Sequence, residues 1–205
     1  MGNSGINHSV WLEKEDLKKL REKVAEGSLD AKIELSALEV EDAHDVEKNL
    51  AFLSDLAEKD KVLALMDLYF IYFEGVTRTE ADGSETVLIA EDEDKAESYL
   101  RKAASLGSSW AMEGCAIRAM VKRMTCDEKD LTEEHFLEEE KWRLAADEAS
   151  QTDKNDLAPS AVVSNMEALA SLYENDNPKN PISNAEKAAL WRSKANKKKN
   201  FDAGI

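Results

Sequence analysis

The stretch ALMDLYFIYFEGV (residues 64–76), followed after a connection by DEDKAESYLRKAASLG (residues 92–107), decides the fold class of this chain. In the first segment Ala64, Leu68 and Tyr72 recur every four residues, which places them on one face of a helix. The second segment opens with Asp92, a residue type favoured at helix N-caps. Two such helices in succession predict an antiparallel helix pair.

The same two patterns recur along the chain. Segments of the second kind begin at Asp45 (DVEKNLAFLSDLA) and Asn184 (NAEKAALWRSKA), and segments of the first kind begin at Ala31, Ala111 and Asn165. Each segment of the second kind carries an aromatic residue at the same place: Phe52, Tyr99 and Trp191. Internal repetition on this scale indicates stacked helix pairs that bury a continuous core.

These motifs resemble the Sel-one-like repeat family, a relative of the tetratricopeptide repeats. That family combines the pattern A-x-x-x-L-G-x-x-Y-x-x-G-x-G-V with D-x-x-K-A-x-x-W-Y-R-K-A-A-x-x-G. The matching residues of the best unit are Ala64, Leu68, Tyr72, Gly75 and Val76, then Lys95, Ala96, Tyr99, Arg101, Lys102, Ala103, Ala104 and Gly107. The resemblance implies an all-α, right-handed superhelical solenoid of about four to five repeats, with about nine or ten helices.

Some features of the repeat array stay open in the sequence. We expect one domain over residues 11–198, with short flexible ends at 1–10 and 199–205. The connections 77–91 and 150–160 are long for a helical array, and each is either a tolerated surface insertion or a functional loop. The segment EEEKWRLAADEA around Trp142 matches the second pattern only loosely, so its register is undetermined.

Charge and composition restrict the partners of the chain. With 43 acidic and 27 basic residues, the formal net charge is -16. Such a surface repels nucleic acids and anionic membranes, so we expect neither as a partner. We find no secretory signal or membrane-spanning stretch and expect a cytoplasmic protein.

The sequence holds no recognisable catalytic or metal-binding motif. His8, His44 and His135 share no ligand spacing, and Cys115 and Cys126 show no metal or redox spacing. Nucleophile elbows, phosphate-binding glycine loops and dinucleotide fingerprints are absent as well. We therefore expect neither a cofactor nor an enzymatic activity.

Residues 64–75 carry a second apolar face that the repeat pattern does not require. Met66, Phe70 and Phe73 lie opposite the Ala64 face on a helical wheel, with Asp67 and Glu74 between the two faces on one side. The second face is either packed inside the array or available to a partner. The predicted partner-binding residues are Met66, Asp67, Phe70, Phe73, Glu74, Trp110 and Glu113.

The favoured function is that of a non-catalytic scaffold that binds another protein, as a monomer or weak dimer. Because family members include immunity proteins, and because this chain is acidic, one form of that hypothesis is an inhibitor that sequesters a basic toxin or effector. The alternatives are a regulatory or assembly adaptor, a self-assembling structural subunit, and a small-molecule-binding, hydrolase-like member of the family. A basic C-terminal segment, from Arg192 to Lys199, serves either as an electrostatic contact or as a complement to a helix dipole.

Overall fold

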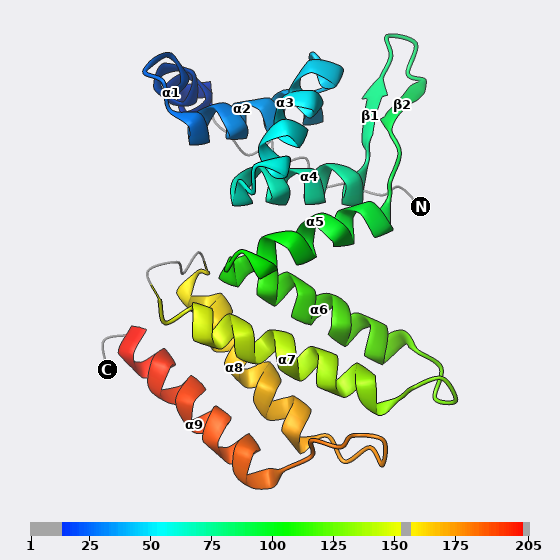
Figure 1. The fold of residues 1–205 in the computed structure, drawn as a ribbon, viewed down its shortest axis with the longest axis vertical. Coiled ribbons are helices and arrows are strands. Elements are labelled where there is room, and N and C mark those ends of the chain that lie inside the picture. Colours follow the sequence, from blue (N-terminus) through cyan, green and yellow to red (C-terminus); the bar gives the residue numbers. More distant parts are fainter. Residues whose placement is uncertain (1–13, 153–156, 203–205) are drawn as a thin grey trace. The chain divides into compact units, whose positions relative to one another are not determined.

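The computed structural model describes residues 14–152 and 157–202 of the chain. These residues form nine helices and two antiparallel strands, in the order α1–α4, β1, β2, α5–α9 (Figure 1). The all-α prediction is confirmed by this architecture. The chain forms two compact units, residues 1–103 and 104–205.

The first unit is built around the helix α2. It contains α1 (Lys14–Ala25), α2 (Leu29–Glu41), α3 (Val46–Glu58), α4 (Val62–Glu74), β1 (Val76–Thr79), β2 (Glu85–Ile89) and nearly all of α5 (Glu93–Ser105). Helix α2 packs against α1, α3 and α4. Asn49 Nδ2 at the start of α3 donates to Glu39 Oε2 at the end of α2 over 2.9 Å, while Lys32, early in α2, lies over the Phe52 ring. The two helices are therefore antiparallel.

The second unit is a row of four helices in which each packs against the next. It contains α6 (Ser109–Thr125), α7 (Glu133–Ala149), α8 (Pro159–Glu174) and α9 (Ala185–Asp202). Arg192 pairs with Glu174, and Lys199 Nζ lies 2.6 Å from Glu167 Oε1, so α8 and α9 run antiparallel. Helix α9 continues to Asp202, four residues beyond the expected boundary at 198. The expected starting residue, Trp11, lies outside the described residues.

Of the three residues that open segments of the second kind, Asp45, Asp92 and Asn184, two form capping hydrogen bonds. The Lys95 N–H donates to Asp92 Oδ1 and the Lys187 N–H donates to Asn184 Oδ1, each over 2.9 Å. Asp45 precedes α3 but makes no such bond, because its backbone is left-handed with φ 44°. Asp45 therefore occupies the N-cap position of α3 without a side-chain capping hydrogen bond.

The connection 77–91, expected as a loop, is mostly a β-hairpin. The Glu80 N–H donates to the Ser84 carbonyl over 2.8 Å, and the Gly83 N–H donates to the Glu80 carbonyl over 3.0 Å. These bonds close a three-residue turn in which Gly83 has φ +82°, the left-handed conformation that such hairpin loops place at glycine. The strands are rich in β-branched residues, which favour extended backbone.

The structure also determines the register of the repeat around Trp142. Five positions of α5 define the repeat: Ala96, Tyr99, Leu100, Ala103 and Ala104. The residues 43 positions later in α7 are Glu139, Trp142, Arg143, Ala146 and Asp147. Apart from the half-buried aromatic, every one of these positions is buried in both helices. Trp142 thus occupies the place of Tyr99, and α6–α7 is a complete repeat.

Helix α9 departs from this pattern in the manner of a terminal helix. Trp191 and Ala195 occupy the places of Tyr99 and Ala103 and are buried. The places of Leu100 and Ala104 hold Arg192 and Asn196, which are exposed. In repeat arrays, the outer face of a capping helix is polar because it contacts solvent instead of another repeat. Within the described residues, the four helix pairs are α2–α3, α4–α5, α6–α7 and α8–α9, preceded by α1.

Candidate protein-binding surface

Helix α4 has two apolar faces that differ in burial. Ala64, Leu68 and Ile71 on the first face are buried, as the repeat pattern predicts. On the second face Phe70 is half-buried, and Phe73 keeps 38% of its surface exposed. The second face of α4 is therefore only partly buried, unlike the first face, which belongs to the core.

The aromatic side chains of α4 stack on one another along the helix. The Tyr69 ring lies 5.6 Å from the Phe73 ring in a stacked arrangement, and 5.1 Å from the Phe70 ring in a tilted one. Tyr69 is almost fully buried, so it anchors the two partly exposed rings. Such contacts restrict the rotamers of Phe70 and Phe73 before any partner binds, which lowers the entropic cost of association.

A group of carboxylates adjoins this aromatic face. Burial, together with the nearby negative charges of Glu41 and Glu34 on α2, raises the pKa of Asp67 to about 7. Met66 on the same helix is half-buried, and Glu74 at its end is exposed. A desolvated carboxylate among other carboxylates is stabilised by an added positive charge. The electrostatics of this surface therefore favour a cationic group.

The seven predicted binding residues fall in different units. Met66, Asp67, Phe70, Phe73 and Glu74 lie on α4 in the first unit, within residues 62–74. Trp110 and Glu113 lie near the start of α6 in the second unit, and both are half-buried. Burial raises the pKa of Glu113, and the positive charge of Arg143 partly offsets that rise.

Sequence reasoning missed a buried polar network in the second unit. Arg143 donates from Nε to Glu139 Oε1 over 2.8 Å and from Nη1 to Asn165 Oδ1 over 3.3 Å. Asn165 Nδ2 in turn donates to the Arg143 carbonyl, and Arg123 Nε donates to the second Glu139 oxygen. The network links α6, α7 and α8. Glu139 and Arg143 are spaced i, i+4, but the undetermined register around Trp142 hid that they point into the core.

Asp147 lies one turn beyond Arg143 on the same face of α7. It is 6% exposed, and its Oδ2 accepts a hydrogen bond from Gln151 Nε2, whereas Oδ1 is buried without a partner in the described part of the chain. Burial raises the pKa of Asp147, and the positive charge of Lys194 on α9 opposes that rise. Burial of the Asp147 carboxylate therefore disfavours its charged form and lowers the stability of the fold.

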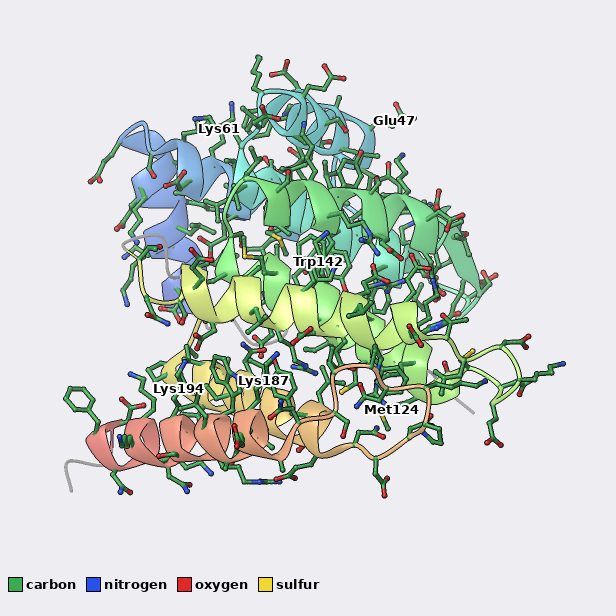
Figure 2. The ribbon with its side chains drawn as sticks, turned by 60° about the horizontal axis from the view of Figure 1, so that its bottom comes forward. Glu47, Lys61, Met124, Trp142, Lys187 and Lys194 are labelled. Atoms are coloured by element: carbon green, nitrogen blue, oxygen red, sulfur yellow. The ribbon has the colours of Figure 1, made fainter. Side chains whose placement is uncertain are left out.

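The basic C-terminal segment is largely engaged in contacts within its own unit. Lys187 and Lys194 project from the same side of α9 (Figure 2). Lys187 Nζ lies 3.5 Å from Glu140 Oε1 of α7, while Lys194 Nζ lies 3.7 Å from the centre of the Trp191 ring. The pairs of Lys187, Arg192 and Lys199 join α9 to α7 and α8, whereas the Lys194 contact lies within α9.

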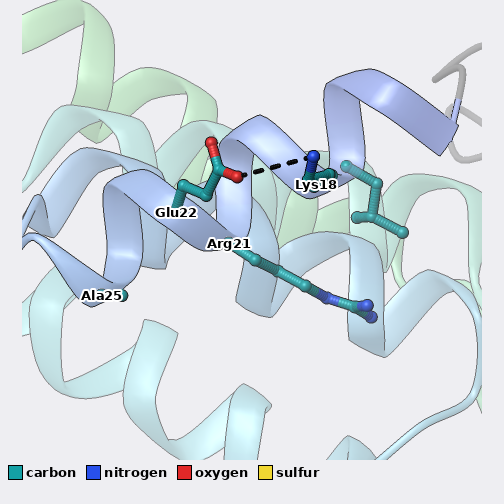
Figure 3. A pocket seen from close by; sticks show the side chains of 5 residues that line it. Lys18, Arg21, Glu22 and Ala25 are labelled. Atoms are coloured by element: carbon teal, nitrogen blue, oxygen red, sulfur yellow. Dashed lines mark ion pairs between the residues drawn. The ribbon is translucent and has the colours of Figure 1, made fainter.

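An open groove runs along α1, and the described residues that line it all belong to this helix. Leu17, Lys18, Arg21, Glu22 and Ala25 line it, and Lys18 pairs with Glu22 over 3.9 Å (Figure 3). Among the described residues, polar groups from several elements, as a small-molecule site requires, do not converge there. Within residues 14–152 and 157–202, no three His, Cys, Asp or Glu side chains are grouped to hold a metal ion. The helices of this part also include none with the length and apolar character of a membrane span.

Comparison with known proteins adds one structural similarity. No protein-family model matches the chain, and no curated protein matches it. The structure is similar to that of a Sel1 repeat protein from Oxalobacter formigenes, with a TM-score of 0.37 and 15% sequence identity over 90% of this chain and 79% of that one. That protein belongs to the family that the sequence motifs resemble. The repeats of this chain are defined by the packing and burial of its own helices.

Proposed function

We propose that this chain is a non-catalytic binding module that sequesters a basic protein, such as a toxin or effector, in the manner of an immunity protein. Its main support is the second apolar face of α4, where Phe70 and Phe73 are partly exposed on the same helix as the carboxylate of Asp67. Aromatic anchors commonly dominate the energy of protein interfaces, and charges at the rim chiefly set the association rate.

The partner's chemistry follows from the carboxylates around Asp67. A lysine or arginine placed beside Asp67 would be attracted by Glu34 and Glu41 as well. It would also lower the raised pKa of Asp67, so binding near neutral pH would release a proton. An acidic partner would instead add to the repulsion among these groups, which is why a basic one is favoured.

The test begins with capture of the natural partner from native lysate, followed by affinity measurements with three variants. Phe70→Ala and Phe73→Ala should each weaken binding by roughly 1–4 kcal/mol. Leu144→Ala on α7 is the matched control, because Leu144 and Phe73 have the same exposed fraction, 38%. The control should leave affinity unchanged.

Thermal stability measured on the same variants separates binding from packing. If Phe70 and Phe73 act only in the core, their removal will lower stability while the affinity of the folded protein stays intact, and the proposal is wrong. Charge reversal by Asp67→Lys should slow association and weaken its dependence on salt. An association rate that is indifferent to salt in the wild-type protein would eliminate the basic partner.

A further inference from the structure

A cavity of about 340 Å³ lies in the first unit, where α1 meets the second half of α2 and the turn that joins α2 to α3. Its volume is near the lower end of the range for ligand sites, roughly 300–1,000 Å³, which is enough for a single long side chain. Described residues from three segments line it, whereas those that line the groove of Figure 3 all belong to α1.

Leucine side chains form the apolar part of the lining: Leu17 of α1, and Leu35 and Leu38 of α2. Leu38 is 8% exposed, and the other two are half-buried in the same hydrophobic cluster. A ligand with an aliphatic segment would cover the exposed parts of these leucines and remove apolar surface from water. The cavity therefore favours a ligand that is partly apolar.

The charged part of the lining is mainly acidic. Glu39, Asp42 and Asp45 contribute three carboxylates, Arg21 contributes one guanidinium group, and His44 is the remaining polar side chain. The Asp42 carboxylate makes no ion pair or side-chain hydrogen bond with the described residues. The excess of carboxylates attracts a positively charged group. Together with the leucines, it fits a cation on an aliphatic stem.

The acidic side of the cavity is held in place by hydrogen bonds. The His44 N–H donates to the Glu39 carbonyl over 2.7 Å, which closes the turn after α2. Asn49, which is 5% exposed, donates from Nδ2 to Glu39 Oε2 over 2.9 Å. Because these bonds fix the turn and one of the carboxylates before a ligand arrives, binding costs less conformational entropy.

The arrangement of the carboxylates distinguishes between kinds of cation. Within the described ranges, no three His, Cys, Asp or Glu side chains are grouped closely enough to hold a metal ion. An ammonium group likewise concentrates its charge and donors at one point, whereas a guanidinium group distributes five N–H donors over a planar fork. The guanidinium group is also more weakly hydrated, so it loses less on entering a cavity with an apolar wall. Arginine therefore fits better than lysine.

We propose that this cavity binds an arginine side chain of a partner protein, with its aliphatic stem against Leu35 and Leu38 and its guanidinium group beside Asp42. That the partner is a basic protein rests on the proposed function, but the cavity itself is separate from the apolar face of α4. Arg21 opposes this binding, because its positive charge repels that of the ligand. Removing the charge of Asp42 and removing the charge of Arg21 should therefore change affinity in opposite directions.

Titration of the full chain with butylguanidinium, followed by NMR, tests the cavity without the partner. Backbone amide signals of Leu38 and His44 should shift, with a dissociation constant on the order of 1–10 mM for so small a probe. Asp42→Asn should raise this constant about two- to fivefold, and Arg21→Gln should lower it by a similar factor. Asp30→Asn is the matched control, because Asp30 is an exposed aspartate at the other end of α2, and it should leave the constant unchanged.

Butylammonium, titrated in the same way, tests the preference for guanidinium. It should bind more weakly than butylguanidinium to the wild-type chain. Equal binding of the two cations would overturn the assignment to arginine. The absence of amide shifts at millimolar butylguanidinium, or dissociation constants that neither Asp42→Asn nor Arg21→Gln changes, would overturn the site.

The captured partner protein then tests the source of the arginine. Asp42→Asn should weaken the affinity for the partner, and Arg21→Gln should strengthen it, each about two- to fivefold. If butylguanidinium binds but neither variant changes the affinity for the partner, the protein source is wrong and the cavity binds a small guanidinium compound instead. The proposed function fails separately: Phe70→Ala and Phe73→Ala that leave partner affinity intact would overturn it without changing the binding of butylguanidinium.

Discussion

Arg143 donates from Nε to Glu139 Oε1 over 2.8 Å, although the two residues are only 3% and 1% exposed. In α5 the equivalent positions hold Leu100 and Ala96, so an ion pair in one repeat replaces an apolar contact in another. Buried ion pairs lose hydration on folding, and they are tolerated when hydrogen bonds satisfy their remaining polar atoms. Arg123 and Asn165 provide those bonds here.

Removing one member of this pair should be strongly destabilising. Glu139→Ala should lower the free energy of unfolding by roughly 3–5 kcal/mol, because it leaves the buried Arg143 guanidinium without its carboxylate partner. Arg143→Leu should lower it by less, because Arg123 still pairs with Glu139. The double variant, which has the residues of α5 at both positions, should lose less free energy of unfolding than the two single variants lose together. Urea unfolding of the wild type, the two single variants and the double variant measures this coupling. Strictly additive losses would show that the two residues are not coupled. As a control, Lys59→Ala, which breaks the exposed pair with Asp55, should cost about 1 kcal/mol or less.

The stability of the protein should depend on the protonation of Asp67. Its pKa is about 7 in the fold and about 3.9 in an unfolded chain, so the folded state binds more protons between these values. Stability contributed by this group is therefore present at low pH and is lost as pH rises through 7. Asp67→Asn removes the ionisable group, so the variant does not lose this stability as pH rises. At pH 8 it should be more stable than wild type by a few kcal/mol at most, on the order of the pKa difference. Urea unfolding at pH 5 and pH 8 measures this, and an equal difference at both pH values would disprove it.

Overpacking should distinguish an interior repeat position from its terminal equivalent. Ala104→Leu inserts a large side chain where 1% of the residue is exposed and should cost roughly 1–3 kcal/mol. Asn196→Leu makes the same residue at the equivalent but exposed position of α9 and should change stability by about 0.5 kcal/mol or less. Thermal unfolding of both variants tests the assignment. Equal losses would show that the register or the terminal role of α9 is wrong.

Gly75, between α4 and the hairpin, should tolerate no side chain. Its φ is +68°, and a Cβ there would lie 2.9 Å from the Ile89 carbonyl oxygen and 3.1 Å from the Glu91 nitrogen. Gly75→Ala should therefore lower the free energy of unfolding by roughly 1–3 kcal/mol. Gly27→Ala is the control, because Gly27 also has a positive φ of +92° but no atom within 4 Å of an added Cβ. A larger loss for Gly27 than for Gly75 in urea unfolding would contradict the steric explanation.

The hairpin at residues 76–89 has a local signal in the sequence. Asp82 and Gly83 lie between two β-branched segments, which is a recognised hairpin pattern. The helical repeat on either side favoured reading residues 77–91 as a connection between helices. The turn at Asp82 and Gly83 forms the hairpin, because its hydrogen bonds need no contact with the rest of the array.

The sequence alone determined the helices, their pairing and the buried face of α4. Those features follow from periodicity and capping, which are local properties of the chain. Only the tertiary structure decided how each side chain is surrounded. The raised pKa of Asp67 depends on Glu34 and Glu41 of another helix, and the burial of Arg143 depends on partners from α6 and α8. Desolvation and charge pairing arise between elements distant in sequence, so no spacing within one helix could predict them.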